Sequence, residues 1–409
     1  MALFGGRTRM ALALGFGVAL MAMAEPLGAA SPAIEGCSIF PVDSIWNARV
    51  DGLPVAANSA AYVSTIGTTR TMHPDFGAGM WDGGPIGIPF VTVPGNQPRV
   101  SVTFDYDDES DPGPYPVPVN PPIEGGPDSD GDRHILVLDT GECVLYELYY
   151  AFPKPDGGWH AGSGAVFDLR SNELRPNTWT SADAAGLPIL PGLVRYDEVA
   201  AGEIRHAIRF TAPVTQKRHV WPARHAASSN TSTSVPPMGQ RFRLKASFDI
   251  SSFSPAMRVI LTAMKRYGII LADNGSAWYV SGAPDSRWND DDLVSSFHRI
   301  LGSAFEAVDT SSLMISADSG QARPAPLPPP VKTYTLTVKV TGGPGTVTSS
   351  IPGLRCSAGV CGASFPAGMR VTLTTSGGTL REWSGACSGR GTCVVTMTKV
   401  RSVTARFRF

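Results

Sequence analysis

The chain has 409 residues, including 44 glycines and 35 prolines, and 17% of its residues are charged, against about 25% in an average soluble domain. This composition argues against long helices or coiled coils, and a hydrophobic content of 43% argues against general disorder. At roughly 150 residues per domain, two or three domains are expected. The net charge of -1 argues against a nucleic-acid binder with a basic field over its whole surface.

The N-terminus has the pattern of an export signal. Arg7 and Arg9 supply positive charge, and residues 10–21 carry none and lead into Ala-Met-Ala, whose small residues suit cleavage. We assign residues 1–24 to a signal peptide, with cleavage after Ala30 as the alternative. A membrane anchor needs about 20 apolar residues, and this run is shorter. We therefore expect a protein that is secreted or held at the cell surface, with no transmembrane span after signal removal.

The main domain is expected to cover residues 37–317. It contains short runs with strand-like composition, connected by long loops rich in glycine and proline, which predicts a mainly β fold. We expect an antiparallel β-sandwich, jelly-roll-like, with a few late helices. The strand-like runs are 90–93, 100–106, 134–138, 144–150, 165–169, 204–210, 220–222, 241–245 and 269–273.

Two helices are predicted late in this domain. Ser254 and Pro255 form an N-cap followed by proline at the first helical position, apolar residues recur at helical spacing, and Gly268 marks the end. A second helix is expected over 290–301, where three aspartates at its start complement the helix dipole.

Four ionisable residues share predicted strand faces with apolar neighbours, namely Glu147, Asp168, His206 and Asp273. Such groups are costly to bury unless they are paired or functional. A functional interpretation is a cleft in which one carboxyl is a general acid, a second is a base or nucleophile, and His206 assists, as in glycoside hydrolysis. The alternative is that each residue satisfies backbone or arginine partners.

Candidate substrate-binding residues are aromatic or basic. Tryptophans such as Trp159 and Trp221 offer flat faces that suit stacking on sugars, although they would also suit a core. Arg224 and His225 follow a strand end, where a polysaccharide lyase could use them to neutralise a uronate and remove its proton. They could equally be exposed loop residues.

An acidic loop suggests calcium. Asp128, Asp130 and Asp132 alternate in a Gly-containing segment like an oxygen-ligand calcium loop, but the final glutamate ligand of the helix-loop-helix pattern is missing. One interpretation of this loop is a structural calcium site, and no other cofactor is expected.

A proline-rich linker is predicted over 318–332, followed by a domain over 333–409 whose short alternating segments indicate antiparallel β-structure. This C-terminal domain has nine basic residues and one acidic residue, a net charge of +8, which leaves -9 for the rest of the chain. It could attach the protein to an anionic cell-wall or envelope polymer, or its charge could serve solubility alone.

An even number of cysteines in an exported chain predicts disulfides. Six cysteines allow 15 pairings, but their clustering in the sequence favours three. These are Cys37 with Cys143, Cys356 with Cys361, and Cys387 with Cys393. Zinc is not expected, because CxxC spacing is absent and no histidine follows His298.

The segments GGPGTVTSS, CSAGVCGASFPAGMRVTLT, EWSGACSGRGTCVVTM and SVTARF resemble, in order, the divergent InlB B-repeat (bacterial repeat) domain. The resemblance covers nearly all of the C-terminal domain and implies a small disulfide-bonded β module of secreted or surface proteins. The segments GGPIGIPF, DESDPGPYP, GLVRYDEVAAGEIRHAIRF and KRYGIILADNG are similar to a group of uncharacterised secreted bacterial proteins, which transfers no activity.

The sequence therefore favours a secreted polysaccharide-active enzyme, with a glycosidase ahead of a lyase. A non-catalytic carbohydrate-binding or adhesin-like surface protein is the alternative.

Overall fold

The computed structural model describes residues 31–326, 332–351 and 353–409. The predicted signal peptide and part of the predicted linker lie outside these residues. Strands make up 34% of the described residues and helices 12%, which confirms the mainly β prediction. The buried apolar residues form clusters within 37–322 and a separate cluster within 336–407, so each predicted domain has a core of its own.

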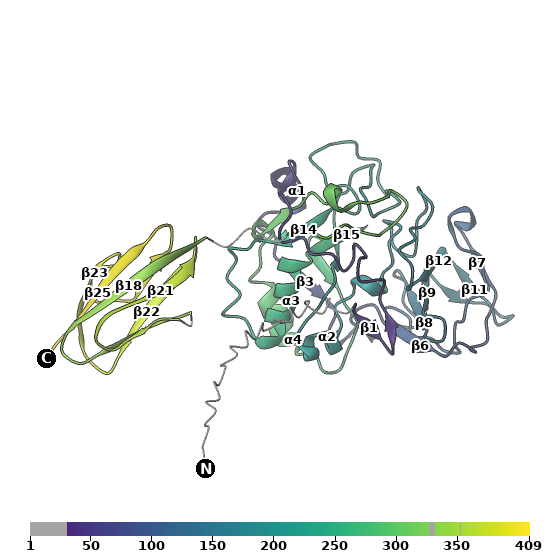
Figure 1. Cartoon of the computed structure of the whole chain (residues 1–409). Coiled ribbons are helices and arrows are strands. Elements are labelled where there is room, and N and C mark those ends of the chain that lie inside the picture. Colours follow the sequence, from purple (N-terminus) through teal and green to yellow (C-terminus); the bar gives the residue numbers. More distant parts are fainter. Residues whose placement is uncertain (1–30, 327–331, 352) are drawn as a thin grey trace, which may run out of the picture. The chain divides into compact units, whose positions relative to one another are not determined.

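The largest sheet of the main domain has six strands in the order β17-β14-β15-β13-β16-β3. Figure 1 labels β3, β14 and β15 of this sheet. Helix α3 (Pro255–Arg266) packs on β14, and α4 (Asp290–Phe297) packs on β3. Helices α1 (Ser59–Ile66) and α2 (Tyr196–Ala201) were not predicted. The strands are β3 (His73–Asp75), β13 (Ile208–Ala212), β14 (Arg241–Leu244), β15 (Ile269–Asn274), β16 (Tyr279–Ser281) and β17 (Phe305–Ala307).

A second sheet of the main domain has four strands in the order β12-β9-β8-β6, beside a small sheet in the order β10-β11-β7. The bounds are β6 (Phe90–Val93), β7 (Val102–Phe104), β8 (Ile135–Asp139), β9 (Val144–Tyr149), β10 (Phe152–Pro153), β11 (Trp159–Ala161) and β12 (Ser163–Asp168). Two short hairpins complete the domain, β1 (Ala33–Ile34) with β2 (Cys37–Ser38) and β4 (Met80–Trp81) with β5 (Gly84–Pro85).

The sheets are mixed, whereas the sequence predicted antiparallel pairing. Parallel pairs join β13 to β15, β16 to β3, β6 to β8 and β11 to β7. The strands of a parallel pair tend to be buried on both faces, and every residue of β8 is buried. For this reason the alternation of polar and apolar residues is a weak guide to the inward face in this domain.

The late helices confirm the capping signals in the sequence. The Ser254 hydroxyl accepts a hydrogen bond from the Met257 amide, and the Asn289 side chain accepts one from the Asp292 amide. Both are N-cap bonds that satisfy otherwise free amides of the first turn.

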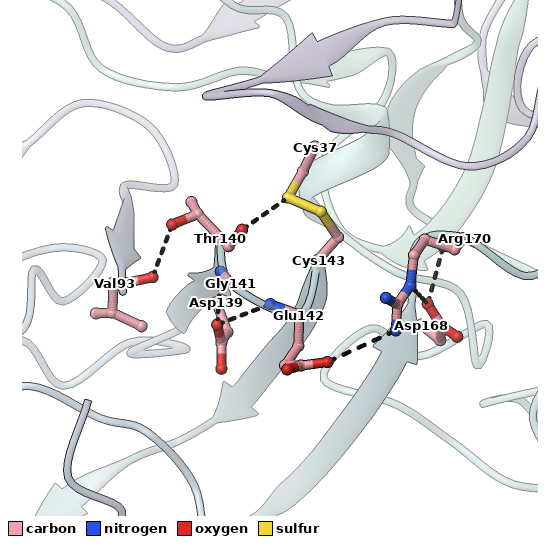
Figure 2. Close-up of a disulfide and its surroundings, with 9 residues drawn as sticks. All are labelled: Cys37, Val93, Asp139, Thr140, Gly141, Glu142, Cys143, Asp168 and Arg170. Atoms are coloured by element: carbon pink, nitrogen blue, oxygen red, sulfur yellow. Dashed lines mark hydrogen bonds and ion pairs between the residues drawn. A yellow bond between two sulfur atoms is a disulfide. The ribbon is translucent and has the colours of Figure 1, made fainter. Parts of the chain in front are cut away.

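The predicted disulfides are all present. The bond between Cys37 and Cys143 joins β2 to the turn after β8 (Figure 2). In that turn the Asp139 carboxylate accepts hydrogen bonds from the amides of Gly141 and Glu142, at 3.0 and 3.2 Å. The disulfide therefore ties the N-terminal segment to the second sheet.

The predicted linker begins too early in the sequence. The Ile45 amide donates to the Gly320 carbonyl, and Ala322 belongs to the main core. Asp318 also accepts a hydrogen bond from Arg224 at 2.7 Å. The chain therefore stays in the main domain through Ala322.

The C-terminal domain consists of two four-stranded sheets. The first has the order β21-β18-β25-β23 and the second β20-β19-β22-β24. The bounds are β18 (Thr333–Gly342), β19 (Thr346–Ser349), β20 (Arg355–Cys356), β21 (Gly359–Pro366), β22 (Arg370–Ser376), β23 (Leu380–Gly385), β24 (Cys393–Thr396) and β25 (Arg401–Phe407).

Candidate functional site

A row of polar side chains crosses three neighbouring strands of the six-stranded sheet. Asp75 of β3 is the register partner of Ser281 of β16, and the antiparallel pairing of β16 with β13 continues the row to Arg209. The Arg209 guanidinium donates to the Ser281 hydroxyl at 2.6 Å. Arg209 is 4% exposed, so its charge must be balanced inside the protein.

Two carboxylates balance the charge of Arg209. Asp183, which is fully buried, takes a bidentate pair from Nε and Nη2 at 2.7 and 2.8 Å. Asp273 at the end of β15 accepts a longer bond from Nη2, at 3.3 Å. These carboxylates raise the pKa of Arg209 against the opposing effect of its burial.

Asp273 holds its proton more tightly than an ordinary aspartate. Burial, followed by the negative charge of Asp183, raises the pKa of Asp273 to about 7, against the opposing effect of Arg209. Its carboxylate also accepts a hydrogen bond from the Asn274 amide. A carboxyl with such a pKa can donate a proton near neutral pH.

Asp273 lines a cavity of about 370 Å³. Asp183, Glu109 and Asp132 also line it, together with the rings of Tyr106 and Tyr149. The Glu109 carboxylate accepts a hydrogen bond from the Thr180 amide at 2.9 Å. The Asp132 side chain is exposed and has no hydrogen bond or ion pair among the described residues. The cavity is therefore acidic and contains one free carboxylate.

A buried histidine lies behind Asp132. His134 hydrogen-bonds through Nδ1 to the Glu124 carboxylate, and its Nε2 lies 2.9 Å from the Ala182 carbonyl. Ala182 also lines the cavity. Glu124, with a smaller effect from Asp132, raises the pKa of His134 to about 9 despite complete burial, and His134 lowers the pKa of Glu124. The pair is therefore charged at neutral pH and fixes the cavity wall.

Glu124, Asp132 and His134 have ligand atoms within 4.8 Å of one another, a spacing that could hold a metal ion. However, both ring nitrogens of His134 already have partners in the protein. The same arrangement is therefore explained by an ion pair between His134 and Glu124, without a metal ion. Among the described residues, this group includes Asp132 but neither Asp128 nor Asp130. Calcium prefers oxygen ligands alone, so the predicted aspartate loop gains no support as a calcium site.

The predicted catalytic residues do not share one cleft. Glu147 is completely buried, and its carboxylate accepts hydrogen bonds from the amides of Ile189 and Leu190 at 2.9 to 3.0 Å. Burial raises the pKa of Glu147 to about 7 against those hydrogen bonds. Since no substrate can reach this side chain, its role is structural, which was the alternative interpretation.

Asp168 faces the wrong way for a role in the cavity. Ala165 and Phe167 take the inward positions of β12, which leaves Asp168 exposed. Its carboxylate pairs with Arg170 at 3.2 Å, close to the disulfide of Cys37 (Figure 2). The prediction that it faces inward is wrong, because the bulkier Phe167 fills the core.

His206 lies before β13 rather than within it, so the argument from strand alternation does not apply. It is completely buried, and its Nε2 lies 3.0 Å from the Glu198 carboxylate of α2. Its Nδ1 lies 2.8 Å from the Ala207 carbonyl. These contacts anchor α2, and the predicted catalytic role of His206 is not compatible with its burial.

Of the predicted substrate-binding residues, the structure places His225 on the cavity wall. Its Nδ1 lies 2.8 Å from the Ala184 carbonyl. Trp159 is buried in a core cluster, and the Trp221 indole donates to the Ser319 carbonyl at 2.8 Å. Arg224 is buried and donates to the carbonyls of Arg175 and Ala317, both at 2.7 Å. Arg224 therefore binds the protein itself rather than a substrate.

Sequence reasoning missed Arg209, Asp183 and the pair of His134 with Glu124. Strand alternation places Arg209 on the face opposite to Ile208 and Phe210, but that face is covered as well. A signal existed at Asp183, which is the one charged residue of the long segment 176–194. If a lone carboxylate in such a segment is buried, it needs a cation or hydrogen-bond donors as partners.

Comparisons with known proteins found no match to a family model, to a curated protein or to a solved structure. Among the described residues, no helix is long and apolar enough to cross a membrane. The disulfides are compatible with an extracellular location.

Proposed function

We propose that the main domain is a glycoside hydrolase that acts on a polysaccharide, with its reaction centre in the cavity beside Asp273. One observation carries this proposal. A carboxyl with a pKa near 7 and a free, exposed carboxylate, that of Asp132, line the same cavity. Most glycosidases need two carboxyl groups in different protonation states, one that donates a proton and one that acts as a base or nucleophile.

In this mechanism protonated Asp273 donates its proton to the glycosidic oxygen as the bond to the sugar carbon breaks. Asp132 is the second carboxylate. It either removes a proton from the water that attacks the sugar carbon, or attacks that carbon itself to form a glycosyl ester, which water then hydrolyses as the ionised Asp273 takes the proton of that water. Tyr106 and Tyr149 supply rings at the cavity wall that suit contact with sugar faces. Arg209 and Asp183 act as positioning residues, since they hold Asp273 and set its proton affinity.

A polysaccharide lyase is a weaker candidate. A lyase that acts on uronates needs a cation to neutralise the substrate carboxylate, but Arg209 is engaged by two aspartates and Arg224 by Asp318 and two carbonyls. The remaining carboxylates of the cavity would repel a uronate. A carbohydrate-binding protein without activity is the other alternative.

We further propose that the protein is exported and that its basic C-terminal domain attaches it to an anionic polymer. The predicted signal peptide and the three disulfides support export, and the charge of the C-terminal domain supports attachment.

Incubation of the full chain with a panel of polysaccharides tests the enzymatic proposal. New reducing ends that disappear in Asp273→Asn are the expected result. Absorbance from an unsaturated uronate would instead identify a lyase, and retention without a product would identify a binding protein. Either of these two results contradicts the hydrolase.

A further inference from the structure

Basic side chains of the C-terminal domain converge on one groove of about 830 Å³. Five of its lining residues are basic, and they come from strands and loops that are far apart in the sequence. They are Lys339, Arg381, Arg390, Arg406 and Arg408. More than half of the nine basic residues of this domain therefore surround one hollow.

The strand register explains part of this convergence. Lys339 pairs with Thr404, and Thr341 pairs with Arg406, across β18 and β25. Their neighbours in the strands, such as Val340 and Ala405, are buried, so these polar residues share the outer face of the sheet. Two cations and two hydroxyls thus lie in adjacent rows on that face.

The positive charge of the groove is largely uncompensated. Arg406 pairs with Glu382 at 3.5 Å, but no carboxylate of the described residues lies within ion-pair distance of Lys339, Arg381 or Arg390. The Thr341 hydroxyl oxygen is also buried without a hydrogen-bond partner among the described residues. Mutually repelling cations beside an unsatisfied hydroxyl favour an anionic ligand with oxygen atoms.

We infer that this groove binds the negatively charged groups of a linear anionic polysaccharide. The inference rests on the proposed attachment and specifies its site. Sheet surfaces that bind single-stranded nucleic acid stack successive bases on several aromatic side chains. Among the described residues, the groove has one exposed aromatic residue, Phe409, and the outward positions beside Lys339 on β18 are threonines, Thr335, Thr337 and Thr341. Hydroxyls suit hydrogen bonds to sugars, and the arginines suit sulfate, phosphate or carboxylate groups.

Binding of the full chain to dextran sulfate, with uncharged dextran as the matched polymer, tests the inference. The groove variant is Lys339→Gln with Arg381→Gln and Arg390→Gln. The control is Arg355→Gln with Arg370→Gln and Lys399→Gln, which removes the same charge from exposed positions of the same domain that do not line the groove. Far-ultraviolet circular dichroism and thermal melting establish that both variants fold.

We expect the groove variant to lose about tenfold or more in affinity for dextran sulfate, since each exposed ion pair contributes a factor of about two to five and three are removed together. The control should lose about threefold or less. Wild-type binding should weaken steeply with salt, and uncharged dextran should not bind.

Equal losses in the two variants would overturn the groove and leave only a diffuse charge effect. Absence of dextran sulfate binding by the wild type would overturn the attachment proposal as well. Tighter binding to single-stranded DNA or to anionic vesicles than to dextran sulfate would contradict a polysaccharide partner.

Discussion

Asp183 and Asp273 share the guanidinium of Arg209 unequally. Asp183 has two hydrogen bonds to it, at 2.7 and 2.8 Å, whereas Asp273 has one, at 3.3 Å. Both aspartates line the cavity, but Asp183 is fully buried whereas Asp273 is partly exposed. The negative charge of the better-paired aspartate raises the pKa of Asp273, so that Asp273 keeps a proton where a substrate could take it.

We expect Asp273→Asn to lower glycoside hydrolysis by about 10² to 10⁴-fold, because a general acid contributes about that much. In the wild type, activity should fall as pH rises through about 7, since the carboxyl then loses the proton that it must donate. Initial rates of reducing-end release over a pH series measure both effects.

Asp132→Asn and Asp168→Asn form a matched pair for the second carboxylate. Both side chains are exposed, but Asp132 lines the cavity and Asp168 does not. Asp132→Asn should lose activity by a comparable factor, while Asp168→Asn should retain it. Loss of activity in Asp168→Asn, at an unchanged melting temperature, would move the reaction centre away from the cavity.

The role of Asp183 can be tested through a pH profile. In Asp183→Asn the negative charge beside Asp273 disappears and Arg209 becomes free to pair with Asp273. Both changes favour the ionised form, so the pKa of Asp273 should fall and the alkaline limb of the profile should move to lower pH. Initial rates of the wild type and the variant over a pH series in which both remain folded measure this shift. An alkaline limb at the same pH in both proteins would show that Asp183 does not set the pKa of Asp273.

The sequence could predict features that depend on local chemistry. The helix over 255–266 follows from the N-cap Ser254 and the apolar spacing, and the disulfides follow from the spacing of the cysteines. The helix signal involves residues that are close together in the chain, and the disulfide signal involves cysteine, which pairs with another cysteine.

The candidate site could be predicted only in part, because its residues come from distant segments. Asp273 was found because it ends a clearly apolar strand. Arg209 was missed because its strand is covered on both faces, and Asp168 was misplaced because Phe167, not Val166, fills the core. Pairing between Asp183 and Arg209 depends on tertiary structure, which alternation within one strand does not reveal.

The buried carboxyl of Glu147 makes stability depend on pH. Its pKa is raised from 4.5 to about 7 in the folded protein, so the folded state binds a proton more tightly than the unfolded chain. Its contribution to the free energy of unfolding is therefore fully present below pH 4.5 and is lost as pH rises through 7. The total loss is about 3 kcal/mol.

Glu147→Gln should flatten this dependence. The amide oxygen can still accept from Ile189 and Leu190, but the side chain no longer ionises. Urea denaturation at pH 5 and pH 8 should show a smaller decline in the free energy of unfolding for the variant than for the wild type. An identical decline would mean that Glu147 is ionised in the folded protein across this range.

The disulfide between Cys37 and Cys143 closes the longest loop, with a separation of 106 residues. Its removal in Cys37→Ala with Cys143→Ala should lower the free energy of unfolding of the main domain by roughly 4 to 5 kcal/mol, since the unfolded chain regains the entropy of that loop. Cys387→Ala with Cys393→Ala opens a loop with a separation of 6 residues and should cost about 2 kcal/mol in the C-terminal domain.

Because each domain has its own hydrophobic core, the two effects should appear in separate unfolding transitions. Denaturation can be followed by tryptophan fluorescence, because Trp383 belongs to the C-terminal core and Trp278 to the main core. A transition that one double variant shifts can then be assigned to the domain that carries that disulfide. If the first double variant lowered both transitions together, the domains would unfold as one cooperative unit, and the loop-entropy argument could not be applied to the main domain alone.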